Sequence, residues 1–261
     1  MMSDQLFSIE GRVALVTGGS RGIGRMIAEA YAARGAKVYI SSRKADACDR
    51  AAAEISDAGG VCVSLPQDIS SVEGADNLAA RLREREPKLD ILVNNAGAAW
   101  LAPIDEFPEA GWDKTVDLNL KSPFFLTKAL LPELRAAANA TKPAKVINIA
   151  SIDGMRPNPQ ETYAYQASKA GLIHLTRRLA AQLIRNNICV TAIAPGAFPS
   201  EMNRDARDHA ATVAQRIPSR RVGDAEDIQG LAIFLASRAG DYVVGATIPA
   251  DGGVALAQLG I

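Results

Sequence analysis

The sequence predicts an α/β protein in which helices cover both faces of a parallel sheet. Short apolar, β-branched segments alternate with longer helical patterns along the 261-residue chain. These short segments are hydrophobic almost throughout, which is typical of strands that are buried on both faces. A glycine-rich turn follows the first of them and leads into a helical pattern. Together these observations predict a single-domain, doubly wound Rossmann fold over residues 1–261, with seven parallel strands and right-handed crossovers.

The expected strands span residues 12–17, 37–41, 61–65, 89–95, 145–150, 188–194 and 246–250. Helical patterns cover residues 22–35, 45–59, 72–86, 109–138, 163–183 and 225–237, and several of them end on glycine, as helices often do. Residues 196–223 follow a strand, contain Pro199 and Pro218 and read as irregular. A loop of this length in a compact domain is usually functional, so we expect a lid over the substrate.

Composition excludes several classes of function. The chain has 29 Lys and Arg against 29 Asp and Glu, so no basic surplus indicates a nucleic-acid partner. No apolar stretch approaches the roughly 18 residues of a membrane helix, and the N-terminus lacks the pattern of a signal peptide. Cys48, Cys62 and Cys189 have no metal-binding spacing, so we expect reduced cysteines, no metal site and a cytoplasmic protein.

A glycine-rich turn, TGGSRGIG, joins the first expected strand to the first expected helix. Glycines permit the tight turn and let a diphosphate approach the backbone, while the helix N-terminus supplies N–H groups and a positive dipole. This context predicts a dinucleotide site, although its G-x-x-x-G-x-G spacing differs from the commoner fingerprint. The residues expected to hold the cofactor here are Gly18, Ser20, Arg21, Gly22, Ile23 and Gly24.

The end of the second strand indicates which dinucleotide is preferred. An acidic residue there would bind the ribose 2′-hydroxyl of NAD, but this chain has Ser41-Ser42-Arg43-Lys44. Arg43 and Arg21 suit a 2′-phosphate, because the guanidinium group matches phosphate geometry. We therefore expect NADP(H), the alternative being that both arginines are solvated surface residues.

Tyr165 and Lys169 lie four residues apart on an expected helix, and Ser151 precedes the tyrosine by 14 residues. Positions four apart share one helix face, so the Lys169 ammonium is expected near the phenol. A neighbouring cation favours the phenolate and lowers its pKa from about 10. The phenol then suits general acid–base catalysis, and the Ser151 hydroxyl suits the same substrate oxygen.

With Asn94-Asn95-Ala96-Gly97, Asn119 and Pro195-Gly196 also in order, the chain resembles the short-chain dehydrogenase/reductase family over nearly its whole length. The resemblance implies that Tyr165 is the general acid or base, with a pKa lowered by Lys169. It also implies that Ser151 orients the substrate carbonyl and that Asn119 holds a water linked to Lys169. The further cofactor contacts that it implies are Asp68, Ile69, Asn95, Ala96, Gly97, Tyr165, Lys169, Pro195, Gly196, Phe198 and Ser200.

Within the family, the chain is most similar to NADPH-dependent 3-oxoacyl reductases of the rhamnolipid type. This implies reduction of a ketone on an acyl thioester, carried by acyl carrier protein or CoA, in a homotetramer. The alternatives are a sugar acid, polyol or other small ketone as substrate, or a nucleotide-binding regulator without catalysis. Asp153 and Arg156 follow Ser151 in a polar loop, and we expect both to be solvated, the alternative being that they reach the substrate.

Overall fold

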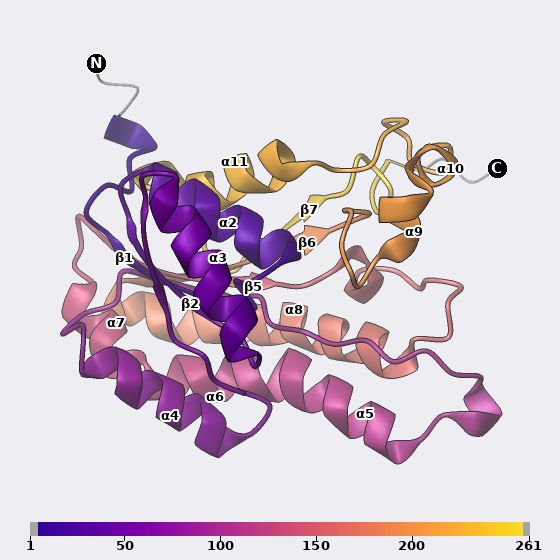
Figure 1. The fold of residues 1–261 in the computed structure, drawn as a ribbon, viewed down its shortest axis with the longest axis horizontal. Helices are drawn as coiled ribbons and strands as arrows, with labels where there is room; N and C mark the ends of the chain where they lie inside the picture. The colour runs from indigo at the N-terminus through magenta and orange to yellow at the C-terminus, as the bar shows by residue number, and fades with distance from the viewer. Residues whose placement is uncertain (1–4, 258–261) are drawn as a thin grey trace.

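The computed structural model describes residues 5–257, and its strands form one parallel sheet of seven strands (Figure 1). The strand order is β3-β2-β1-β4-β5-β6-β7, and every neighbouring pair is parallel. This confirms the predicted fold class. The strands are β1 (Val13–Thr17), β2 (Lys37–Ser41), β3 (Val61–Ser64), β4 (Ile91–Asn94), β5 (Ala144–Ile149), β6 (Ile188–Pro195) and β7 (Thr247–Ala250).

Helices cover both faces of the sheet (Figure 1). One face carries α2 (Gly22–Ala33), α3 (Ala45–Asp57) and α11 (Ala225–Ala236). The other carries α4 (Val72–Arg83), α5 (Glu109–Val116), α6 (Ser122–Ala129), α7 (Leu131–Ala137) and α8 (Tyr163–Leu183). Every residue of β1, β4, β5 and β6 is buried, which explains their nearly continuous hydrophobic sequences. None of the described helices has the length and apolar character needed to cross a membrane.

The strand order places a crevice at one end of the sheet. β1 pairs with β2 on one side and with β4 on the other, so the order of the strands reverses direction at β1. Ligands of open parallel sheets bind outside the carboxyl ends of the strands at such a reversal. The glycine-rich turn after β1, the Asn94–Gly97 segment after β4 and Ser151 after β5 all lie at these carboxyl ends.

The structure differs from the expected elements in two regions. The single helix expected over 109–138 is divided into α5, a π-helical turn η2 (Asp117–Lys121), α6 and α7. Pro123 and Pro132 lie in the first turns of α6 and α7, where proline is tolerated. The segment 196–223 is not wholly irregular, since it contains the short helices α9 (Arg204–Asp208) and α10 (Ala210–Ala214).

Candidate active site

The glycine-rich turn packs directly on the segment that follows β4. Gly18 has a φ of +67°, and a Cβ there would lie 2.7 Å from the Asn95 Nδ2 atom. The Asn95 amide donates to the Thr17 carbonyl over 2.8 Å. The Thr17 hydroxyl accepts from the backbone N–H groups of Asn95 and Ala96, each at 3.0 Å. Thr17 therefore fixes the Asn95–Gly97 segment against the turn, a role that our sequence analysis did not assign.

Gly24 provides a sharp test of this packing. A Cβ at Gly24 would lie 2.5 Å from the Gly18 carbonyl oxygen and would also overlap Asn95 Nδ2. We expect Gly24→Ala to lower the free energy of unfolding by about 1–3 kcal/mol and to weaken dinucleotide binding, because the turn or Asn95 must shift. Urea unfolding and fluorescence titration with NADPH measure the two effects.

Gly230→Ala is the matched control for this substitution. Gly230 lies within α11, and a Cβ there meets nothing within 4 Å. Because alanine is the better helix former, the control should be neutral or more stable by up to about 1 kcal/mol. Equal effects of the two substitutions would show that Gly24 has no special role in the turn.

The start of α2 has the features of an anion site. Arg21 is the N-cap residue, has extended backbone angles and makes no side-chain cap hydrogen bond. Because an arginine side chain has no acceptor atom, Arg21 leaves the first N–H groups of the helix available to an anion. Arg43 is exposed just beyond the carboxyl end of β2, and the nearby Ser41 hydroxyl is buried without a hydrogen-bond partner. These features fit a phosphorylated nucleotide.

The remaining residues expected at the cofactor lie in two further segments. Asp68 is exposed after β3, and its carboxylate accepts from the Ser70 N–H. The side chains of Ile69 and Phe198 are buried in the two hydrophobic clusters, so only their backbone is available to a nucleotide. A Cβ on Gly22 would lie 3.5 Å from the Ser200 Cβ, so the segment after β6 reaches the glycine-rich turn.

Ser151 is oriented by the turn that follows β5. Its Oγ accepts from the Asp153 N–H over 3.1 Å, which caps the 3-10 turn η3 (Ile152–Gly154). A Cβ on Gly154 would lie 2.5 Å from the Lys169 carbonyl carbon, so only glycine allows η3 to pack this closely on α8. This contact brings Ser151 near Tyr165, where its hydroxyl acts to lower the pKa of the phenol. Gly154 was not predicted to have this role, although a glycine stands three residues after Ser151 in the sequence.

Tyr165 and Lys169 share one face of α8, as predicted. The Lys169 Nζ atom lies 5.6 Å from the centre of the Tyr165 ring and donates to the Ile149 carbonyl over 2.7 Å. Lys169 is only 4% exposed, and burial lowers its pKa to about 8. The ammonium group is therefore held at the crevice despite the cost of its desolvation.

The expected lowering of the Tyr165 pKa is wrong for this arrangement. Burial raises the pKa of Tyr165 to about 12, while the hydrogen bond from Ser151 acts in the opposite direction and the charge of Asp153 adds to the rise. Burial disfavours the phenolate because the charged form loses its hydration. Tyr165 is thus a neutral phenol at physiological pH, which makes it a proton donor.

Asn119 lies in the π-helical turn η2 and is fully buried. Its Oδ1 accepts from the Ala98 N–H over 2.8 Å, and its Nδ2 donates to the Ala98 carbonyl and to the Ser168 hydroxyl. A Cβ on Gly97 would lie 3.2 Å from Asn119 Oδ1 and 3.8 Å from Lys169 Nζ. Asn119 therefore lies beside Lys169, at the kind of π-helical turn often found at functional sites.

The expectation that Asp153 is solvated is wrong. Its side chain is half-buried rather than solvated, and its carboxylate accepts from the Asn158 amide over 3.1 Å. Burial raises the pKa of Asp153, against the hydrogen bond from Asn158 and the charge of Arg156, which lower it. Arg156 is exposed, as expected.

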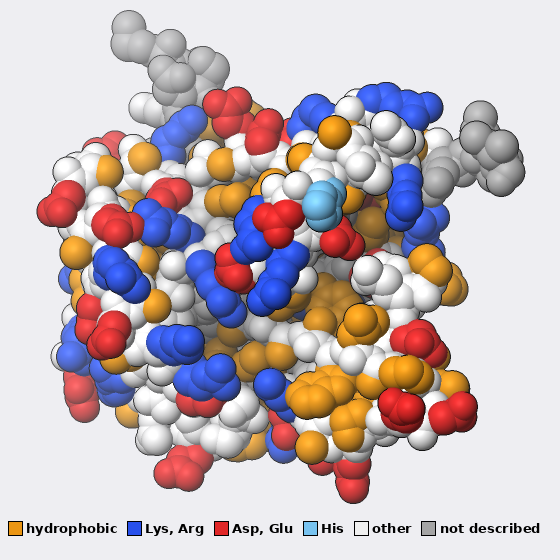
Figure 2. All heavy atoms as spheres, turned by 45° about the vertical axis from the view of Figure 1, so that its right-hand side comes forward, with side chains coloured by type: hydrophobic (Ala, Val, Ile, Leu, Met, Phe, Trp, Pro, Cys, Tyr) orange, Lys and Arg blue, Asp and Glu red, His pale blue; other side chains and the backbone are white. Residues whose placement is uncertain are grey.

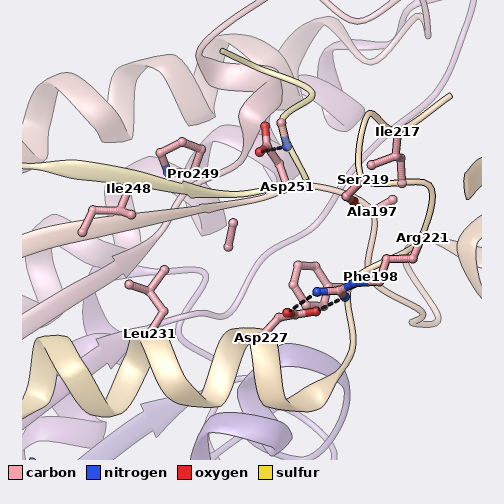
Figure 3. Close-up of a pocket in the computed structure, with 14 residues that line it drawn as sticks. Ala197, Phe198, Ile217, Ser219, Arg221, Asp227, Leu231, Ile248, Pro249 and Asp251 are labelled. Atoms are coloured by element: carbon pink, nitrogen blue, oxygen red, sulfur yellow. Dashed lines mark hydrogen bonds and ion pairs between the residues drawn. The ribbon is translucent and has the colours of Figure 1, made fainter. Parts of the chain in front are cut away.

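A separate pocket of about 440 Å³ lies behind the segment that follows β6 (Figure 3). The Arg221 side chain pairs with both carboxylate oxygens of Asp227 at its edge. Phe198 lines it, and a Cβ on Gly223 would lie 2.5 Å from that ring. The catalytic side chains do not line this pocket, so it is not the place where Tyr165 acts.

The face that bears the crevice is hollowed, with Lys and Arg side chains gathered on one side of the hollow and hydrophobic side chains on the other (Figure 2). Residues 18–255 of the chain match the family model described as enoyl-(acyl carrier protein) reductase. The chain belongs to the short-chain dehydrogenase/reductase family. This membership and the arrangement of Ser151, Tyr165 and Lys169 make the chain an oxidoreductase.

Two relatives and one solved structure place the chain within this family. It is 48% identical to the 3-oxoacyl-(acyl-carrier-protein) reductase of rhamnolipid biosynthesis from Pseudomonas aeruginosa, over 95% of this chain and 97% of that protein. It is 36% identical to sorbitol dehydrogenase from Cereibacter sphaeroides, over 94% and 98% of the two chains. The solved active-site complex of Pseudomonas aeruginosa RhlG with NADP superimposes with a TM-score of 0.93 at 47% identity, covering 97% of this chain and 99% of that one.

Proposed function

We propose that this protein uses NADPH to reduce the ketone of a 3-oxoacyl thioester carried on acyl carrier protein or CoA. The observation that carries the reaction type is the buried Tyr165 phenol, which lies near Ser151 and beside the buried Lys169 ammonium. The similarity to a 3-oxoacyl reductase supports the substrate class. The similarity to a structure that contains NADP supports the cofactor.

When bound, NADPH would supply the hydride that reduces the ketone carbon, and the residues of this chain act on the carbonyl oxygen. Ser151 donates a hydrogen bond to the carbonyl oxygen, which orients it toward Tyr165. Tyr165 donates its phenolic proton to this oxygen as negative charge develops there. Lys169 stabilises the phenolate that remains, since its ammonium lies on the same side of the ring. The water expected at Asn119 stays a prediction.

Exposed apolar side chains near the mouth support an acyl substrate. The segment after Gly97 is tied to Asn119 at Ala98 and to Glu161 at Ile104, so it borders the catalytic residues. Leu101 and Ile104 on this segment are 66% and 67% exposed. Apolar surface of this kind favours an alkyl chain over a sugar acid. We propose that residues 196–223, which reach the glycine-rich turn at Ser200, close over the bound thioester.

The substrate class is tested with a panel of ketones at a fixed concentration of NADPH. We expect kcat/KM for acetoacetyl-CoA and longer 3-oxoacyl-CoA thioesters to exceed that for 5-ketogluconate and for ketoses by about tenfold or more, because apolar burial grows with each methylene. A clear preference for a sugar acid or ketose would assign the protein to that alternative. NADPH binding without turnover of any ketone would instead indicate a nucleotide-binding regulator.

The 2′-phosphate preference is tested at Arg43. We expect Arg43→Ala to raise the KM for NADPH by about 10- to 100-fold and to leave the KM for NADH nearly unchanged, since a charged hydrogen bond contributes about 1.5–3 kcal/mol. Arg21→Ala should act in the same direction. Arg34→Ala is the control, because Arg34 lies at the opposite end of α2. An unchanged ratio of NADPH to NADH efficiency in both variants would refute this assignment.

We also propose a cytoplasmic homotetramer that pairs α5, α6 and α8 across one two-fold axis and β7 across another. β7 is the edge strand of the sheet, and Tyr242 and Val244 just before it are exposed. Phe124 on α6 is 37% exposed. Light scattering during gel filtration would test this assembly, which predicts the mass of four chains.

A further inference from the structure

One acidic residue holds the mouth segment, which is residues 98–104 after β4. The backbone carbonyl of Glu161 accepts from the Ala102 N–H, and Glu161 Oε1 accepts from the Ile104 N–H, each over 3.3 Å. The Tyr163 hydroxyl donates to the same Oε1 over 2.9 Å and so orients the carboxylate. Glu161 therefore fixes the backbone of the mouth segment at two points.

The loop that carries Glu161 is itself anchored to α8 by Gln166, the residue after Tyr165. Gln166 Oε1 accepts from the Asn158 N–H over 3.0 Å. Its Nε2 donates to the carbonyls of Asn158 and Gln160, over 3.1 and 3.0 Å. A glutamine amide has two donor hydrogens, so Gln166 directs both of them to this loop. Glu161 and Gln166 thus connect the mouth segment to the helical turn that carries Tyr165.

The side chains held in this way are apolar and face solvent. Leu101 and Ile104 are 66% and 67% exposed. Residues 98–103 belong to no helix or strand, so a regular ladder of backbone hydrogen bonds does not hold them. The bonds to Glu161 therefore decide where these two side chains lie relative to the catalytic residues. Hydrophobic side chains line one side of the hollow on this face (Figure 2).

We propose that Glu161 is a positioning residue that sets the chain-length preference of the reductase, because it holds Leu101 and Ile104 as an apolar wall beside the alkyl chain of the substrate. Gln166 fixes the loop from which Glu161 acts. This inference rests on the proposed function, since it takes the substrate to be an acyl thioester. Each methylene buried against the wall raises kcat/KM by about two- to fourfold. An acetoacetyl group has a single methyl beyond its ketone, so it gains little from the wall.

The test measures kcat/KM with NADPH for 3-oxoacyl-CoA thioesters of four to twelve carbons. In the wild type, log kcat/KM should rise with the number of acyl carbons. We expect Glu161→Ala to reduce this slope by about half, so that the twelve-carbon thioester loses at least about tenfold more in kcat/KM than acetoacetyl-CoA does. A defect in folding or in NADPH binding would instead lower kcat/KM by the same factor at every chain length.

Three further variants separate the hydrogen bond from other effects. Glu161→Gln keeps an acceptor oxygen for the Ile104 N–H and should restore the slope of the wild type. Gln166→Met removes the bonds to the loop and should reduce the slope, as Glu161→Ala does. Glu106→Ala is the matched control, because Glu106 is an exposed acid just after the mouth segment whose side chain has no partner among the described residues. It should leave the slope unchanged.

A second readout needs no substrate. The Ile104 N–H donates to the Glu161 carboxylate, so its hydrogen exchange should be about 2- to 10-fold faster in Glu161→Ala than in the wild type or in Glu161→Gln. A slope and an exchange rate equal to those of the wild type would overturn the inference, as would an equal loss at every chain length. A wild type that reduced only sugar ketones would refute the proposed function, while the exchange rate would still decide whether Glu161 holds the mouth segment.

Discussion

Tyr165→Phe is expected to lower kcat for ketone reduction by about 10²–10⁴-fold, the usual contribution of a positioned acid or base. The substitution removes the hydroxyl that lies near Ser151 and belongs to the ring beside Lys169. NADPH affinity should change little, because the ring and the packing of α8 are retained. Steady-state kinetics and fluorescence titration with NADPH measure these two quantities separately.

Tyr163→Phe is the matched control for this effect. Tyr163 lies two residues earlier on the same helix, but its hydroxyl donates to Glu161 and its ring packs edge-on against Phe107. We expect it to retain kcat within about threefold, as a side chain outside the reacting groups should. If Tyr165→Phe turned over at the wild-type rate, the proton donor would have to be another group.

Lys169→Met is expected to abolish most of the activity and yet to stabilise the protein at pH 7. The charged ammonium of Lys169 is buried, and burial lowers its pKa to about 8. Burial of this charge lowers the free energy of unfolding by about 3 kcal/mol, and the substitution removes that cost. The substitution also removes the hydrogen bond to the Ile149 carbonyl, which lowers the free energy of unfolding by about 1 kcal/mol. The variant should therefore gain about 2 kcal/mol in the free energy of unfolding, measured in urea.

The pH dependence of that gain has a definite sign. The folded state releases the Lys169 proton near pH 8 and the unfolded state near 10.5, so the unfolded state binds more protons between these values. The wild type therefore gains stability as pH rises through this window, and its difference from Lys169→Met should shrink. A difference that stays constant from pH 7 to pH 10 would contradict this account.

Lys145→Met should have the opposite effect on stability, because Lys145 is a buried lysine with an acidic partner. The Lys145 Nζ atom lies 2.6 Å from Asp241 Oδ1, and its side chain is 2% exposed. Removing Lys145 breaks this ion pair and leaves the Asp241 carboxylate only 26% exposed, so this variant should be less stable, by about 1–3 kcal/mol. A more stable Lys169→Met and a less stable Lys145→Met would show that the Lys169 charge serves catalysis and lowers the stability of the protein.

Local patterns in the sequence were sufficient for the sheet and the glycine-rich turn. β1 and β5 are buried on both faces, and their short, nearly continuous hydrophobic sequences indicated strands. Gly18 needs a positive φ and Gly24 a close backbone approach, and both requirements appear as glycine in the sequence.

Features that depend on distant contacts were not predicted. The π-helical turn at Asn119 accompanies hydrogen bonds to Ala98, 21 residues away, which no local periodicity encodes. The pKa of Tyr165 was expected to fall because helical spacing reveals Lys169, but spacing does not reveal burial. The half-buried position of Asp153 accompanies contacts with Asn158, which Gln166 binds in turn, and these contacts exist only in the folded loop.

The most direct test of the central claim is the pH profile of kcat/KM for NADPH-dependent reduction of acetoacetyl-CoA by the wild type. A neutral Tyr165 phenol beside a charged Lys169 predicts a constant value from about pH 6 to 7.5 and a decline above about 8, where Lys169 loses its proton. A rate that rises with pH through this range would show that the phenolate is the active form, and would contradict the account.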